Sequence, residues 1–98
     1  MYKGFGFTQI KSDRLINEGH TLLAGLIIEA SADPGDVSIY EGNDEQSGKY
    51  FGKIKGLAND SNVISFPQTL YFDRGLYIDV GSNITGVTVI WLPVPNEE

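Results

Sequence analysis

Apolar and polar residues alternate along this chain in short stretches that turn residues separate. The pattern is clearest between Ser65 and Pro93, where residues 75–80 and 87–92 carry an apolar side chain at every second position. Neighbouring side chains of a strand point to opposite faces of a sheet. The pattern therefore indicates β-strands with one buried face.

The same period recurs in shorter runs over much of the remaining sequence. Further strands are predicted at residues 4–10, 21–30, 36–42, 49–58 and 63–66. Residues 11–20 are ambiguous, because Asp13 could begin a short turn of helix that Gly19 would end. Glycine makes up 12 of the 98 residues and is spread through the chain, which disfavours longer helices. The sequence thus predicts an all-β fold, an antiparallel β-sandwich or jelly roll of about seven or eight short strands without substantial helix.

The more consistently apolar face of each strand predicts the hydrophobic core. Its expected members are Leu26, Ile28, Val37, Ile39, Ile54, Leu76, Ile78, Val80, Val87 and Val89. Pro34 and Gly35 are expected to form a type II turn in which the glycine has a positive φ, and residues 73–75 a hairpin-like turn. Pro67 cannot donate to a ladder, so it marks a bulge or a sheet edge. Three lysines on one face of residues 49–58 are typical of an exposed edge.

We expect a single domain over residues 1–98, because a chain of this length encloses one core. Residues 1–19 are predicted to be an N-terminal arm or edge strands, and residues 93–98 a proline-rich tail. The strands at 21–30 and 87–92 are apolar on both faces, whereas one layer of a small sandwich covers only one face. Their second face predicts a subunit contact, with a central strand covered on both sides as the alternative for residues 21–30.

The charge balance narrows the classes of partner. Thirteen acidic and seven basic residues give a formal net charge of −6. Binding to nucleic acid or to an anionic membrane needs clustered Lys and Arg, so neither partner is expected. The chain has no cysteine, which excludes disulfides and thiolate zinc sites. Its first residues lack the apolar run of a signal peptide, so we expect synthesis in a cytoplasm.

Residues that carry chemistry are few and isolated in the sequence. His20 has no nucleophile or orienting carboxylate at a recognisable spacing, so an exposed loop histidine is predicted. Asn43, Asp44 and Glu45 could present oxygens to calcium, but they do not follow the calcium-loop pattern, and a solvated loop is favoured. We therefore predict no catalytic residue, no cofactor and no metal site.

Aromatic residues are more numerous than one small core accommodates, so some are expected on the surface. Contiguous exposed aromatic side chains usually mark a protein partner or a platform for sugar rings. The alternative is that they are scattered singly or lie under loops. The candidate interface residues are Tyr2, Phe5, Phe7, Tyr40, Tyr77 and Trp91.

A series of short motifs runs through residues 22–93. It comprises a Gly-led apolar strand at 25–30, "VSIYEG" at 37–42, "SFP" at 65–67, "FDRGLYIDV" at 72–80 and "VTVIW" at 87–91. In this order of elements the chain resembles small all-β virion proteins of tailed bacteriophages, of the capsid decoration or head-accessory type.

The resemblance implies a non-enzymatic virion protein without a cofactor. Such a protein would bind the major capsid protein of a phage as a homo-oligomer, commonly a homotrimer. Two alternatives stay open, a carbohydrate- or receptor-binding β-sandwich module and a small tail or neck component. An enzyme is the least favoured interpretation.

Overall fold

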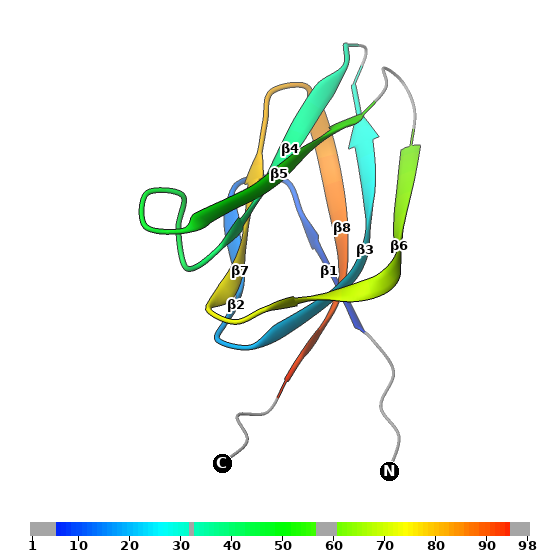
Figure 1. Ribbon diagram of the computed structural model, residues 1–98. Coiled ribbons are helices and arrows are strands. Elements are labelled where there is room, and N and C mark those ends of the chain that lie inside the picture. The colour runs from blue at the N-terminus through cyan, green and yellow to red at the C-terminus, as the bar shows by residue number, and fades with distance from the viewer. Residues whose placement is uncertain (1–5, 32, 57–60, 95–98) are drawn as a thin grey trace.

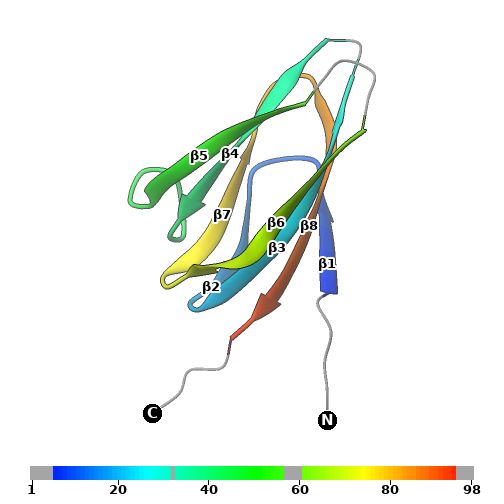
Figure 2. The same ribbon diagram turned by 45° about the vertical axis from the view of Figure 1, so that its right-hand side comes forward.

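The computed structural model describes residues 6–31, 33–56 and 61–94, which form strands and no helix (Figure 1). The strands are β1 (Gly6–Ile10), β2 (Arg14–Glu18), β3 (Thr21–Ala30), β4 (Gly35–Glu41), β5 (Lys49–Gly56), β6 (Ser61–Phe72), β7 (Gly75–Val80) and β8 (Ile84–Pro93). They lie in two layers, which Figure 2 shows from the side.

Each layer is an antiparallel sheet of four strands. Sheet I has the order β1-β8-β3-β6, and sheet II has the order β2-β7-β4-β5. Among the described strands, β4 and β5 are the one consecutive pair that is hydrogen-bonded, and the other connections pass from one sheet to the other. This is the strand order of an eight-stranded jelly roll. The prediction of an all-β sandwich without helix is thus confirmed for the described residues.

The core lies between the sheets and consists mainly of the residues that alternation predicts to face inward. Of the ten predicted members, eight are exposed by 1% or less. The other two, Ile54 and Val80, are partly buried and pack against them. Ile10, Leu23 and Phe72 complete the core.

Residues 14–18 form a strand, so the possible turn of helix in this segment is not formed. β2 pairs with β7 at the edge of sheet II, and its Ile16 packs against the core. Gly19 has a φ of 83° and lies in the turn that follows β2. Because β1 is likewise the edge of sheet I, residues 6–10 and 14–18 are edge strands rather than an arm, whereas residues 1–5 lie outside the described residues.

Two of the predicted turns are wrong. Gly35 is the first residue of β4 and does not have a positive φ. A glycine is needed there for a different reason, because a Cβ atom would overlap the carbonyl oxygen of Ser82. Residues 73–74 do not close a hairpin, since β6 belongs to sheet I and β7 to sheet II. Gly75, with a φ of 118°, follows this connection between the sheets.

The other two edge strands, β5 and β6, lie where the lysines and the proline of the sequence predict sheet edges. β5 is the edge of sheet II, and its three lysines are exposed. β6 is the edge of sheet I, and its register against β3 shifts around Pro67. In the interior of sheet I, β8 includes Pro93, and the backbone N–H of Val94 donates to the carbonyl oxygen of His20 at 3.0 Å. Residues 95–98 of the predicted tail lie outside the described residues.

Candidate functional site

The outer face of sheet I is nearly uncharged and carries six apolar side chains, together with polar ones such as Gln9 and Thr88. The two strands predicted to be apolar on both faces, β3 and β8, are neighbours at the centre of this sheet. Strand register places Phe7 beside Ile90, and Ile27 beside Val63. Phe7 and Val63 are 70% and 71% exposed, on the two edge strands. The apolar face of sheet I comprises Phe7, Leu22, Ile27, Val63, Ile90 and Leu92.

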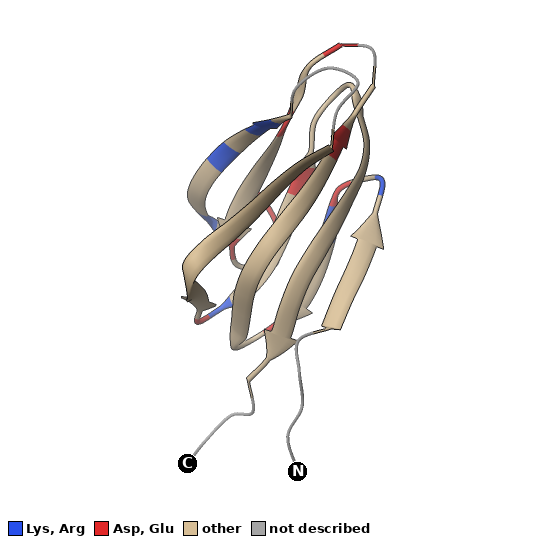
Figure 3. Cartoon of the chain, turned by 90° about the vertical axis from the view of Figure 1, so that its right-hand side faces the viewer, with Lys and Arg blue, Asp and Glu red and all other residues tan. Residues whose placement is uncertain are grey.

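Charged residues are divided unequally between the two sheets. The strands of sheet I have 5, 10, 10 and 12 residues and contain one charged residue, Glu29. The strands of sheet II have 5, 7, 8 and 6 residues and contain eight. Figure 3 looks onto sheet I, whose strands are drawn almost entirely in the colour of uncharged residues. The molecule therefore has one apolar and one polar broad face.

Three tyrosines form a row across the outer face of sheet II. Tyr77, Tyr40 and Tyr50 occupy neighbouring positions on β7, β4 and β5. The ring centroids of Tyr40 and Tyr77 are 6.3 Å apart, and those of Tyr40 and Tyr50 are 5.6 Å apart, both edge-to-face. Burial, followed by the charge of Glu45, raises the pKa of Tyr40. The shift moves the pKa further from neutral pH, where the hydroxyl is protonated and can donate a hydrogen bond.

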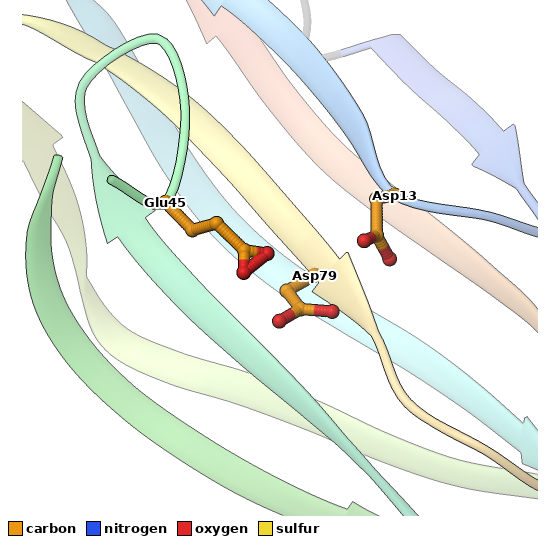
Figure 4. A group of neighbouring side chains, drawn as sticks. All are labelled: Asp13, Glu45 and Asp79. Carbon is orange, nitrogen blue, oxygen red and sulfur yellow. The ribbon is translucent and has the colours of Figure 1, made fainter. Parts of the chain in front are cut away.

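Three carboxylates lie together near this row (Figure 4). Asp13 precedes β2, Asp79 is on β7, and Glu45 is in the loop between β4 and β5. A carboxylate oxygen from each lies within 4.8 Å of the others. The backbone N–H of Val80 donates to Asp13 Oδ1 at 2.8 Å and so fixes one of the three. Carboxylate oxygens are the ligands that Ca²⁺ and Mg²⁺ take, so these residues could hold a divalent cation.

The loop between β4 and β5 presents Glu45 through its own hydrogen bonds. Asp44 Oδ1 accepts from the backbone N–H of Ser47 at 2.7 Å and from its hydroxyl at 2.8 Å. The backbone N–H of Gly48 donates to the carbonyl oxygen of Asp44 at 2.9 Å. The hydrogen bonds from Ser47 lower the pKa of Asp44. Asp44 therefore organises the loop, and Glu45 is the loop residue that joins the carboxylate cluster.

Asp79 is the carboxylate of the cluster that resists ionisation. Burial, and after it the hydrogen bond and the charge of Asp13, raises the pKa of Asp79 from 3.8 to about 6. Between pH 4 and pH 6 the folded chain therefore binds more protons at this group than the unfolded chain does. Since stability rises with pH only where the unfolded state binds more protons, this group makes the fold less stable as the pH rises through that interval.

Replacing Asp79 with asparagine is expected to raise the free energy of unfolding at pH 7 by about 1 kcal/mol and to leave it unchanged at pH 4. The full pKa shift would correspond to about 3 kcal/mol, but water screens this partly exposed group and reduces the gain. Urea denaturation of both proteins at pH 7 and pH 4 measures the change in the free energy of unfolding. Asp33→Asn removes the same charge from an exposed position outside the cluster and serves as the control. Equal effects of Asp79→Asn at both pH values would contradict the assignment.

His20 lies in the turn between β2 and β3, where the structure gives it two partners. Its ring stacks on that of Tyr71 with centroids 5.6 Å apart, and its Nδ1 is hydrogen-bonded to the Tyr71 hydroxyl. Asp73 Oδ1 lies 3.1 Å from the same Nδ1. The orienting carboxylate that sequence spacing did not indicate is therefore present, because the turn after β2 meets the turn after β6.

These groups are not arranged as in a catalytic triad, because the hydroxyl of Tyr71 and the carboxylate of Asp73 approach the same ring nitrogen of His20 instead of one nitrogen each. Burial, followed by the charge of Asp73, raises the pKa of Tyr71. The neighbouring hydroxyl of Thr21 is buried and donates to the Gly19 carbonyl oxygen at 3.0 Å. The three side chains thus link two turns, and the backbone N–H of Asp73 extends the link by donating to Glu41 Oε2 at 2.7 Å.

A hollow of about 180 Å³ lies where the beginning of β5 approaches the end of β6. The residues that line it include Glu41, Lys49, Tyr50, Phe51, Tyr71 and Phe72. Its walls are therefore largely aromatic, with one carboxylate and one ammonium group. Of the five large hydrophobic side chains that stand out as exposed among the described residues, three line this hollow.

The predicted interface residues do not form one surface. Phe7 lies on the outer face of sheet I, whereas Tyr40 and Tyr77 lie together in the row on sheet II. Tyr2 and Phe5 lie outside the described residues.

Trp91 differs from these residues because it is turned toward the core. It is partly buried against the core cluster, and its Nε1 donates to Thr8 Oγ1 at 3.0 Å. Its environment is thus that of a tryptophan at the margin of a core, where the indole N–H has found a partner.

The sequence drew attention to His20 and Glu45, but not to the side chains that they meet in the folded chain. Asp79 had a visible signal, since it is a carboxylate at an outward position between apolar residues of a short strand. No signal in the sequence connected Tyr71 or Asp73 with His20. Tyr71 lies 51 positions after the histidine that it contacts.

The chain matches no protein family model and no curated protein. Within the part of the chain that the structure describes, no helix has the length and apolar character needed to cross a membrane.

Proposed function

We propose that this protein is a non-enzymatic structural protein that self-associates through the apolar face of sheet I and decorates the surface of a phage capsid. The observation that carries the proposal is the broad, nearly uncharged outer surface of sheet I. Contiguous apolar surface of this kind is typical of protein–protein contacts.

The broad side of the molecule that carries this surface is large enough for a stable interface. The principal extents of the molecule are 47, 32 and 20 Å, and the shortest fits the thickness of two packed sheets. The broad sides of the molecule are therefore the outer faces of the sheets. Each exceeds the roughly 800 Å² that one partner buries in a protein complex of standard size.

A second copy of the chain is the partner that the charge distribution favours. Two molecules that each carry a net charge of −6 repel one another unless their charges are kept apart. Contact through sheet I buries almost no charge, because Glu29 is the one charged residue of its strands, whereas the four basic and four acidic residues on the strands of sheet II stay in water. The resemblance to phage virion proteins makes a homotrimer the expected assembly.

The virion setting rests on the resemblance and on the class of fold. Eight-stranded jelly rolls occur in viral capsid proteins and in lectins, although a fold alone does not define a function. The proposed partner is the major capsid protein of a phage, with synthesis in the host cytoplasm and assembly into the virion. No cofactor and no catalytic step is part of this function.

Sedimentation velocity at micromolar concentration, followed by negative-stain microscopy, tests the proposal. We expect a mass three times the 10.7 kDa of the chain, and added density on the capsid surface when the protein is mixed with capsids of the phage whose genome encodes it. A monomer of 10.7 kDa would refute self-association. An oligomer that leaves the capsids bare but labels tails or necks would replace decoration with the tail or neck alternative.

The carbohydrate-binding alternative has support from a different part of the molecule. Trp91, one of the residues expected to stack sugars, packs against the core. The aromatic hollow between β5 and β6 is better suited to a sugar, and it adjoins the apolar face of sheet I only where Tyr71 pairs with Leu22.

A further inference from the structure

The hollow between β5 and β6 owes its shape to an irregularity in sheet II. Ile39 pairs with Gly52, but the next residue of β4, Tyr40, pairs with Tyr50, so Phe51 is left without a partner across the strands. In a regular strand Tyr50 and Phe51 would point to opposite faces, whereas here both line the hollow. Bulges of this kind re-aim side chains and are frequent beside functional sites.

The aromatic walls are exposed and yet held in place. Tyr50, Phe51 and Tyr71 are 54%, 51% and 53% exposed. Phe51 contacts the buried Phe72 edge-to-face at 5.6 Å. Tyr71 is stacked on His20. A ligand would therefore meet prearranged rings, and little side-chain freedom would be lost on binding.

The polar groups of the hollow have opposite charges. Glu41 presents a carboxylate whose Oε2 already accepts from the backbone N–H of Asp73, which positions its Oε1. Lys49 is the residue of β5 that pairs with Glu41 of β4, and it presents an ammonium group. An acceptor and a donor on one rim suit a neutral ligand with hydroxyl groups. A wholly apolar ligand would bury both charges without hydrogen bonds, which is costly.

We propose that this hollow binds a single neutral sugar ring of a glycan. The C–H groups of a pyranose carry partial positive charge and pack on the negative face of an aromatic ring, while its hydroxyls bond to Glu41 and Lys49. The volume of about 180 Å³ provides room for one such ring. Four of the lining residues, Glu41, Lys49, Tyr50 and Phe51, come from sheet II or the end of its β4–β5 pair, and the variants that test the site are made there.

Saturation-transfer NMR and chemical-shift titration with glucose, galactose, mannose and N-acetylglucosamine test this site. At least one of the four is expected to bind with a Kd of the order of 1 mM and to shift the amide signals of residues 49–51 and 70–72. Tyr50→Ala should weaken the binding about tenfold, and Glu41→Gln should also weaken it. Lys55→Ala truncates an exposed side chain at the other end of β5, outside both the hollow and the apolar face of sheet I, and should change the Kd by less than about twofold.

Sedimentation and thermal melting of each variant separate this inference from the proposed function. Tyr50→Ala should keep the oligomeric mass and the melting temperature of the unchanged protein while losing the sugar. The absence of binding by all four sugars would overturn the inference, and so would equal Kd values for Tyr50→Ala and Lys55→Ala. Neither result would affect the proposal of self-association.

Discussion

Replacing Ile78 with alanine is expected to lower the free energy of unfolding by about 2–5 kcal/mol. Ile78 lies in the middle of β7, is fully buried, and belongs to the core cluster between the sheets. The truncation removes buried methyl and methylene groups and leaves a cavity that the strands on either side of β7 cannot fill. Urea denaturation followed by circular dichroism measures the loss.

Lys55→Ala is the matched control, because it truncates a long side chain to the same residue in a strand of the same sheet. Lys55 is exposed on β5, so the change should stay within about 0.5 kcal/mol. A loss below about 0.5 kcal/mol for Ile78→Ala would mean that β7 turns its other face inward, since a shift of one residue exchanges the two faces of a strand.

Alternation predicted the faces of the strands well, because the side-chain period of a strand is a local property. The inward positions of β7 and β8 follow directly from the residues of those strands. Alternation does not predict which strands pair. The turns after β6 and after β7 contain the same residue types as hairpin turns, yet each joins strands of different sheets. That choice depends on long-range packing, which no short motif encodes.

The clusters on the surface could be predicted only in part. Glu45 stands in a loop that is rich in oxygen ligands, but the two carboxylates that it approaches come from the connection before β2 and from β7. The contacts of His20 depend in the same way on two turns that meet across the sandwich. The bulge that turns Phe51 toward the hollow likewise depends on how β5 pairs with β4, which the residues of β5 alone do not reveal.

Introducing a lysine at Ile27 is expected to dissociate the proposed oligomer. Ile27 lies on β3 at the centre of the apolar face of sheet I, between Thr88 and Val63 of the adjacent strands. Burying an unpaired ammonium group in an interface costs several kcal/mol, so the affinity between copies should fall by about a hundredfold or more. Sedimentation at micromolar concentration should then give the 10.7 kDa mass of the single chain.

The sign of the introduced charge makes this result informative. Ile27→Lys changes the net charge from −6 to −5, which by itself reduces the repulsion between copies. Dissociation would therefore report the loss of an apolar contact and not a change in overall charge. Tyr77→Lys places the same charge on the opposite broad face, beside the carboxylate of Asp79, and should leave the oligomer intact. If Tyr77→Lys dissociated the oligomer and Ile27→Lys did not, the interface would lie on sheet II, and the assignment to sheet I would have to be abandoned.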